Sequence, residues 1–339
     1  MSEIRKALAE LAEGRDLTSG LMHAAMNEIM GGQADPAQVG GFLMALRVKG
    51  ETPAEIAAAA EVMRSFATRV EIDREGLTDI VGTGGDGSSL FNVSTASAFV
   101  AAAAGVRVAK HGNRSVSSKS GAADLLEAAG CRLDLDCDQV AQLIEELNVG
   151  FLFAPQHHAA MKHAIGPRKS LGLRTLFNLL GPLTNPASAP NQVLGVFSAE
   201  LLAPMAEVMR ALGANHVMVV HSQDGLDEIS PVATTRVAEL RDGAIGEYPI
   251  SPEGFGIQLD SLEGLVVSGA ADSLALIESA LAGEPGPAAD TIALNAGAAI
   301  YVSGQAESLK AGVESAREVL EKGAGLVRLR EYAERTQAL

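Results

Sequence analysis

Residues 78–95 read TDIVGTGGDGSSLFNVST and connect an apolar strand to a helix through a run of glycines. We expect the strand at 78–81 and an alanine-rich helix at 92–104. Glycines at a strand end let the backbone approach a ligand without an intervening side chain. The helix N-terminus behind them adds free N–H groups and the positive end of its dipole. The stretch predicts a phosphate-binding loop, although it is neither a Walker loop nor a GxGxxG motif; a tight turn before a capped helix is the alternative.

Strands and helices alternate on either side of this stretch. Such alternation is typical of an α/β fold with a mainly parallel, mixed sheet flanked by helices. A hairpin is expected over 235–250, with its turn at Asp242-Gly243. Further strands are expected at 106–109, 149–153, 193–197 and 216–221, and further helices at 121–129, 138–148, 162–180, 199–212, 272–281, 290–298 and 306–321.

The first seventy or so residues show only helical patterns. Asp35-Pro36 and the capping box Thr52-Pro53-Ala54-Glu55 mark two helix starts. We therefore predict an N-terminal helical domain at 1–72, joined by helices from about 162–182, and an α/β domain at 73–339.

Composition limits the classes of partner. The chain has 339 residues and a net charge of −16, so its overall field repels nucleic acid and anionic membranes. Phosphates must then be bound locally, by backbone N–H groups, a few cations and metal ions. Cys131 and Cys137 fit neither a zinc knuckle nor a redox pair, and residues 1–11 resemble no targeting peptide. We expect a soluble, cytoplasmic protein with reduced cysteines and without nucleic-acid or membrane partners.

A second polar loop follows the strand expected at 106–109. Its sequence, KHGNRSVSS at 110–118, crowds a lysine, an arginine, an asparagine and serines into an acidic protein. Successive parallel strands bring their carboxyl ends together, so the loop predicts a second anion site beside the first. A solvated polar loop is the alternative.

A third motif, DGLDE at 224–228, follows the strand expected at 216–221. Neighbouring carboxylates at one sheet edge are costly unless a cation neutralises them. Mg²⁺ binds through one or two carboxylates, waters and substrate phosphates, so Asp227 and Glu228 are candidate ligands beside two phosphate loops.

The fourth region, 153–175, contains three histidines and two arginines of interest. No acid or thiol accompanies the histidines, which argues against zinc. Arg168 could pair with a carboxylate of a substrate. Arg174 is interpreted as a structural partner of a helix.

These four segments, in this order, resemble the anthranilate phosphoribosyltransferase family over nearly the whole chain. The stretch FNLLGPLTNP at 177–186 and LNAG at 294–297 extend the similarity. The resemblance implies a nucleoside phosphorylase/phosphoribosyltransferase-like fold, with the active site between the two domains and a homodimer formed through the helical domain. It implies Mg²⁺-dependent transfer of the phosphoribosyl group of 5-phosphoribosyl 1-pyrophosphate (PRPP) to anthranilate, releasing pyrophosphate, in tryptophan biosynthesis.

The resemblance also implies roles for individual residues. The loop at 110–118 should close over the donor. Anthranilate should contact Gly82, Asn113, Arg168, His111 and His158, and Mg²⁺ should contact Ser94, Asp227 and Glu228. PRPP should contact Gly82, Gly85, Asp86, Asn92, Ser94, Thr95, Lys110, Asn113, Ser117 and Ser118.

A few positions depart from the family pattern. Leu90 stands where a threonine is usual, and Ala122 where a serine often contributes to the donor site. His157, Ala159 and Gly166-Pro167 also differ, and they bear on the shape of the acceptor pocket.

Two other functions are open from the sequence: a nucleoside phosphorylase of the same fold, and a non-catalytic relative that binds nucleic acid. The motif at 110–113 and the Asp227-Glu228 pair favour the pyrophosphate donor over the first, and the acidic composition disfavours the second. For the favoured reaction we assign no acid or base, because an aromatic amine is a nucleophile at neutral pH. Its rate should come from positioning and electrostatic stabilisation of the leaving diphosphate.

Overall fold

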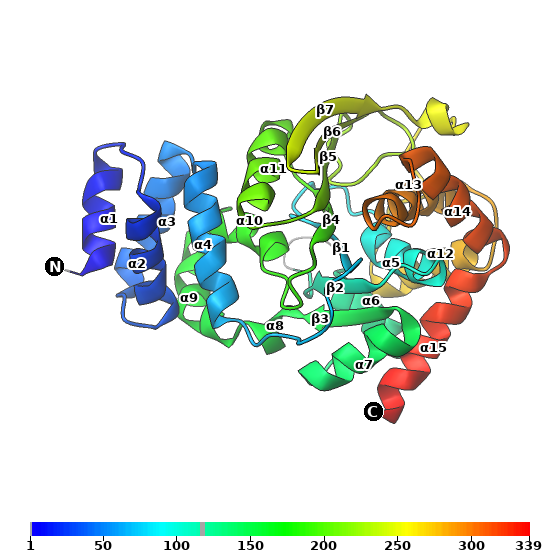
Figure 1. The fold of residues 1–339 in the computed structure, drawn as a ribbon, viewed down its shortest axis with the longest axis horizontal. Coiled ribbons are helices and arrows are strands. Elements are labelled where there is room, and N and C mark those ends of the chain that lie inside the picture. Colours follow the sequence, from blue (N-terminus) through cyan, green and yellow to red (C-terminus); the bar gives the residue numbers. More distant parts are fainter. Residues whose placement is uncertain (1, 116–118) are drawn as a thin grey trace.

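A computed structural model describes residues 2–115 and 119–339 (Figure 1). Its sheet has seven strands in the order β3-β2-β1-β4-β5-β6-β7. The first five of these are parallel, and β6 and β7 continue the sheet as an antiparallel hairpin. The expected mixed sheet flanked by helices is confirmed. The strands are β1 (Thr78–Gly82), β2 (Val108–Gly112), β3 (Val149–Phe153), β4 (Asn191–Gly195), β5 (His216–Ser222), β6 (Thr235–Arg241) and β7 (Ala244–Ile250).

The strand order changes direction between β1 and β4. Strands β2 and β3 lie in succession on one side of β1, and the chain then returns to place β4 on the other side of β1. Ligands bind beyond the carboxyl ends of parallel strands at such a reversal. Gly82 and Gly195 are register partners at these two strand ends, so the topology places the glycine loop beside the end of β4.

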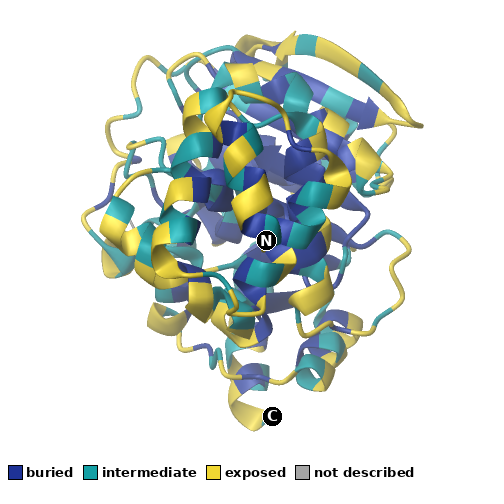
Figure 2. Cartoon of the chain, turned by 90° about the vertical axis from the view of Figure 1, so that its left-hand side faces the viewer, coloured by how far each residue is buried: buried dark blue, intermediate teal, exposed yellow. Residues whose placement is uncertain are grey.

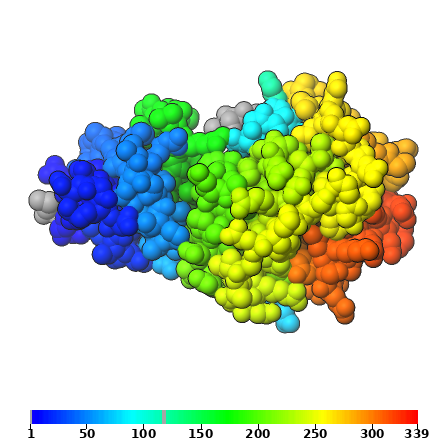
Figure 3. Space-filling model, turned by 90° about the horizontal axis from the view of Figure 1, so that it is seen from above, coloured from blue at the N-terminus to red at the C-terminus, as the bar shows by residue number. Residues whose placement is uncertain are grey.

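The N-terminal residues form four helices, which lie at one end of the molecule (Figures 1 and 3). Asp35 and Thr52 cap the third and fourth of them with both bonds of a capping box. Helix α9 contacts α2 and α3, and α10 contacts α3 and α4. The division at residue 72 stays a prediction. These helices are α1 (Glu3–Ala12), α2 (Ser19–Met30), α3 (Pro36–Lys49), α4 (Pro53–Phe66), α9 (Lys162–Leu171) and α10 (Leu176–Leu183).

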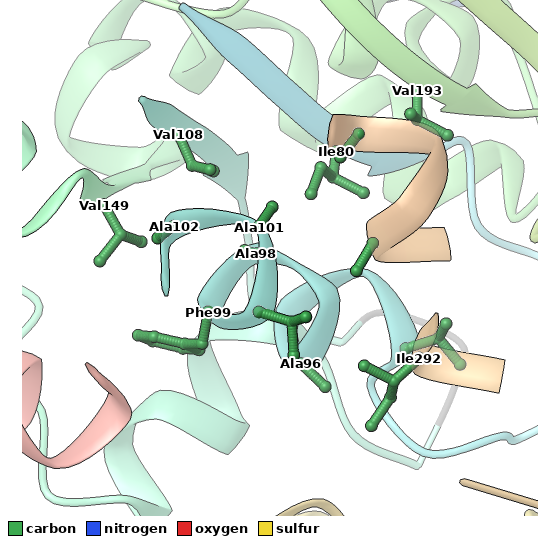
Figure 4. Packing of buried hydrophobic residues seen from close by; sticks show 14 of the residues in the cluster. Ile80, Ala96, Ala98, Phe99, Ala101, Ala102, Val108, Val149, Val193 and Ile292 are labelled. Carbon is green, nitrogen blue, oxygen red and sulfur yellow. The ribbon is translucent and has the colours of Figure 1, made fainter. Parts of the chain in front are cut away.

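The remaining helices surround the sheet. Helix α5 contacts α13, α15 and β1, and Figure 4 shows Ala98 and Ala101 of α5 near Ile80 and Val108 of the sheet. Small side chains let this helix lie close to the strands. These helices are α5 (Val93–Ala103), α6 (Ala122–Ala128), α7 (Cys137–Leu147), α8 (Ala154–His157), α11 (Leu202–Ala211), α12 (Ala270–Leu281), α13 (Pro287–Val302), α14 (Leu309–Glu321) and α15 (Ala324–Ala338), with short 3₁₀ turns η1 (Ala159–Met161), η2 (Ala199–Leu201) and η3 (Pro252–Phe255).

Several element boundaries predicted from the sequence are wrong. The helix expected over 162–180 is two helices, because Gly172 ends α9 in the left-handed region with φ of 60°. Strand β4 ends at Gly195, two residues earlier than expected. Helix α15 was not predicted, since its polar face and high charge hide the few residues that it buries.

Buried residues of the described part of the chain lie inside a surface of exposed and intermediate residues (Figure 2). Two large groups of buried apolar side chains fill the interior, one on each face of the sheet. None of the described helices is long and apolar enough to cross a membrane.

Helix α15 supports the edge strand β3 through one buried hydrogen bond, which generates a stability prediction. The Phe151 N–H donates to the Tyr332 hydroxyl at 3.0 Å. Tyr332→Phe should lower the free energy of unfolding by about 1–2 kcal/mol, because the buried N–H loses its acceptor. Urea unfolding measures the change. Glu331→Gln, on the exposed side of the same helix, is the control. Equal stability of Tyr332→Phe and the parent protein would contradict the assignment.

Candidate active site

The glycine loop after β1 packs directly against a carboxylate. The Gly84 N–H donates to Asp227 Oδ2 at 2.7 Å. A Cβ at Gly82 would lie 2.4 Å from the same oxygen, and a Cβ at Gly195 would lie 1.6 Å from the Asp227 carbonyl. Both strand ends are therefore glycine because Asp227 occupies the space where a side chain would begin.

Glu228 enters the same site from the next position in the chain. The Ser94 hydroxyl, in the first turn of α5, donates to Glu228 Oε1. Burial raises the pKa of Asp227 to about 6, with Asp86 contributing, and burial together with Asp227 raises the pKa of Glu228 to about 8. Asp227 and Glu228 thus share a poorly hydrated space, and ionising both is costly without a cation.

The donor atoms of this site suit Mg²⁺. Asp227, Glu228 and Ser94 offer only oxygen, which is what a hard cation prefers. Among the described residues, no group of three or more acidic, histidine or cysteine side chains could by itself enclose a metal ion. An ion held by two carboxylates would complete its shell with water and substrate oxygens, as Mg²⁺ commonly does.

A buried amide on α13 fixes the carboxylate loop. Asn295 accepts from the Ile229 N–H and donates to the Ile229 carbonyl, both at 2.9 Å. Asp224, the first acid of the motif, accepts from Ser230 at 2.6 Å and braces the turn. Sequence analysis identified Asn295 only as part of the matching run at 294–297, because a contact across 66 residues leaves no local pattern.

Lys110 and His111 lie on β2, which runs to Gly112, so the loop expected from residue 110 begins three residues later than predicted. Both are buried in the strand. The Lys110 ammonium donates to the Ile80 carbonyl at 2.6 Å, and the His111 N–H donates to Asp79 at 3.1 Å. Asp79 also accepts from Asn185 at 2.7 Å. These partners let polar residues occupy a buried strand.

Asn92 joins three segments around the start of α5. Its amide donates to the Ser120 carbonyl at 3.1 Å, and its oxygen accepts from the hydroxyls of Ser120 and Ser273, each at 2.8 Å. The side chain expected to contact a ligand therefore also holds the end of the second polar loop against α12.

Two histidines face each other near α10. The rings of His111 and His158 are 5.2 Å apart, edge to face. Nδ1 of His111 lies 3.1 Å from the Gly181 carbonyl, and the Nε2 atoms of both rings are buried without a partner among the described residues. Burial lowers the pKa of both rings, that of His158 to about 4. Both are neutral at pH 7, with a free acceptor on each ring.

The two arginines of the fourth region differ in their surroundings. Arg168 lies over the Phe177 ring at 5.3 Å from its centroid, and burial lowers its pKa. It forms no ion pair within residues 2–115 and 119–339, so it remains available to a carboxylate. Arg174 was interpreted as a helix partner, but its guanidinium donates to the Gly85 carbonyl of the glycine loop.

The other predicted contacts fall around the same loops. Asp86 accepts from the Ser88 hydroxyl at 2.5 Å, and Thr95 is buried in α5. Asn113 is exposed in the polar loop that follows β2. Arg114 turns away to pair with Glu127 at 2.7 Å. The predicted donor contacts Ser117 and Ser118 lie outside the described residues.

Comparisons with known proteins agree on one family. Residues 74–326 match the model of the α/β domain of a glycosyl transferase family, and residues 5–67 match its helical bundle domain. A protein of Cellvibrio japonicus named anthranilate phosphoribosyltransferase is 60% identical over 99% of both chains.

Two solved structures resemble the whole chain. The anthranilate phosphoribosyltransferase of Thermus thermophilus has a TM-score of 0.93 and 47% identity, covering 99% of this chain and 100% of that one. The Saccharomyces cerevisiae enzyme, solved in complex with PRPP and Mg, has a TM-score of 0.90 and 30% identity, covering 99% of this chain and 98% of that one.

The neutral histidines generate a prediction for pH. Because the folded-state pKa of His158 is about 4 and its usual value is 6.5, stability present above pH 6.5 is lost as the pH falls. Between pH 6.5 and about pH 5 the loss should be roughly 2 kcal/mol, at ~1.4 kcal/mol per pH unit. Urea unfolding at both pH values should show a smaller loss in His158→Gln.

His23, which is partly exposed and pairs with Glu61, supplies the control. His23→Gln should keep the full acid-dependent loss of the parent protein. If His158→Gln and the parent protein lose the same stability, the buried neutral ring is not responsible.

Proposed function

The chain belongs to the anthranilate phosphoribosyltransferase family, and we propose that its glycine loop and buried carboxylates form the site of this family's reaction. It transfers the phosphoribosyl group of PRPP to anthranilate, giving N-(5-phosphoribosyl)anthranilate and pyrophosphate, a step of tryptophan biosynthesis. The observation that carries the site is the Gly84 N–H bond to Asp227. It supports a single site in which backbone amides and metal-binding carboxylates meet.

The donor diphosphate is proposed to lie on the glycine loop and the start of α5. Gly82, Gly85 and the backbone before α5 bring N–H groups to the phosphates. Lys110, buried in the middle of β2, adds positive charge close to Glu228. Asp86, Asn92, Ser94, Thr95 and Asn113, with Ser117 and Ser118 outside the described residues, complete the proposed contacts.

The cofactor is Mg²⁺, as in the relative solved with PRPP and Mg. We propose Ser94, Asp227 and Glu228 as its protein ligands. When bound, Mg²⁺ stabilises negative charge on the leaving diphosphate. Gly84 and Ser94 orient the two carboxylates, and Asn295 holds the loop that carries them.

The acceptor pocket is proposed to lie between the helical end and the carboxyl ends of the strands. Arg168 is half-buried without an acidic partner among the described residues, and it would pair with the anthranilate carboxylate. Gly82 and Asn113, with the neutral rings of His111 and His158, would line the rest. Positioning, rather than a general base, would then supply the rate.

The homodimer is a proposal as well. Three exposed apolar residues lie on or beside contacting helices of the helical end: Val48 on α3, Ile165 on α9 and Leu173 just after α9. Such exposure supports an interface between two copies of the chain.

Residence in the cytoplasm is the last part of the proposal. Cys131 and Cys137 are free thiols, which agrees with a reducing compartment.

The metal ligands generate the first functional prediction. Asp227→Asn combined with Glu228→Gln should leave the fold intact and remove Mg²⁺-dependent turnover, because the amides keep the shape but lose the charge. Turnover is followed by the loss of anthranilate fluorescence, and folding by circular dichroism. Glu263→Gln, an exposed acid, should retain full activity. Near-normal turnover of the double variant would refute the proposed ligands.

Arg168 generates the second functional prediction. Arg168→Ala should raise the KM for anthranilate by about 10–100-fold, as expected for a lost charge-assisted pair, and change the KM for PRPP far less. Steady-state kinetics with each substrate varied in turn separates the two effects. Lys169→Ala, an exposed neighbour on α9, is the control. Equal effects on both KM values would contradict the assignment of Arg168 to the acceptor pocket.

A further inference from the structure

Arg174 connects three segments that are distant in the sequence. It lies between α9 and α10, and its guanidinium donates to the Gly85 carbonyl. The same guanidinium stacks on the Phe197 ring, 4.5 Å from the ring centroid. Phe197 follows β4, so a residue from the helical end contacts the loops after both central strands.

The glycine loop is shaped to admit this guanidinium. Gly85 has a φ of 81°, and a Cβ there would lie 2.8 Å from Arg174 Nη2. At the β1 end of the loop, the Phe197 N–H donates to the Thr83 hydroxyl at 3.1 Å, and the Thr83 N–H donates to the Gly195 carbonyl at 2.9 Å. The loop is thus held by both Arg174 and the end of β4.

The backbone of Arg174 is fixed to the helical end. Its carbonyl accepts from the guanidinium of Arg47, in the last turn of α3. The preceding helix α9 ends where the Gly172 N–H donates to the Arg168 carbonyl at 3.2 Å. A short, bonded segment therefore connects Arg168 with the glycine loop.

The same loop also contacts a carboxylate. The Gly84 N–H donates to Asp227 Oδ2, next to the Gly85 carbonyl that accepts from Arg174. Arg174 therefore holds the part of the loop that touches Asp227.

We propose that Arg174 is a positioning residue that couples occupancy of the glycine loop to the affinity of the Arg168 pocket. The proposal rests on the proposed function, in which the loop holds the diphosphate and Arg168 holds the acceptor carboxylate. When a diphosphate fixes the conformation of the glycine loop, the bond from Arg174 to Gly85 also restricts the segment that carries Arg168. Energetic coupling of this kind is reciprocal between the two sites.

The experiment measures coupling rather than turnover. Anthranilate is titrated by fluorescence with and without inorganic pyrophosphate and Mg²⁺, which occupy the loop without reaction. In the parent protein, pyrophosphate should tighten anthranilate binding by about fivefold or more. Arg174→Ala should bring this factor close to one, while the anthranilate affinity without pyrophosphate stays that of the parent protein.

Three further variants sharpen the experiment. Arg47→Ala keeps the guanidinium but frees its backbone, and it should lower the coupling factor in part. Arg174→Lys keeps the charge without the planar fork, and it should restore less than half of the coupling free energy. Lys169→Ala, which removes an exposed positive charge from α9, should leave coupling unchanged. If Arg174→Ala does not fold, Arg47→Ala and Arg174→Lys carry the test.

Three outcomes would overturn the inference. Coupling could be absent from the parent protein, or it could persist in full in every Arg174 and Arg47 variant. A weaker affinity for pyrophosphate with unchanged coupling would make Arg174 a plain phosphate ligand. Failure of the proposed function is distinguishable, because the parent protein would then show no turnover of anthranilate with PRPP.

Discussion

Two adjacent carboxylates lie in a poorly hydrated space where no ammonium or guanidinium group of residues 2–115 and 119–339 bonds to them, and much of the site is arranged around that constraint. Burial raises the pKa of both carboxyls; the charge of Asp86 adds to the shift of Asp227, and the charge of Asp227 adds to that of Glu228. Such a pair is destabilising by itself and becomes favourable when a cation and an anionic ligand arrive together. Burial of these charges thus destabilises the ligand-free protein, and binding of the cation and the anionic ligand removes this destabilisation.

The fold provides the positions that this constraint needs. The reversal of strand order between β1 and β4 places two glycine strand ends side by side, and Asp227 lies in the space that their missing side chains leave. Asn295, from a helix on one face of the sheet, fixes the backbone after Glu228. Residues from the helical end, Arg168 and Arg174, then approach the same edge, so neither part of the chain builds the site alone.

The sequence predicted the parts of this site that are local. The glycine run, the helix behind it and the acidic pair are each contained in a few residues, and the rule that parallel strands end together placed them at one edge. The sequence could not predict contacts between segments that are far apart in the chain. The bond from Arg174 to Gly85 spans 89 residues, and that from Asn295 to Ile229 spans 66. Sequence analysis also expected a loop at Lys110 and His111, which lie in strand β2. These polar residues can be buried there because the Lys110 ammonium bonds to the Ile80 carbonyl and the His111 N–H bonds to Asp79. Helix α15 escaped prediction because charged and polar residues interrupt its apolar positions.

The central claim is that backbone amides of the glycine loop and the two carboxylates hold one diphosphate through one shared cation. The most direct measurement is a crystal structure of the protein with PRPP and Mn²⁺ in place of Mg²⁺, in which anomalous scattering locates the metal. The account predicts an anomalous peak bonded to Asp227 or Glu228 and to a diphosphate oxygen, with the diphosphate lying over Gly84 and Gly85. A metal and diphosphate bound at another edge of the sheet, away from these residues, would contradict it.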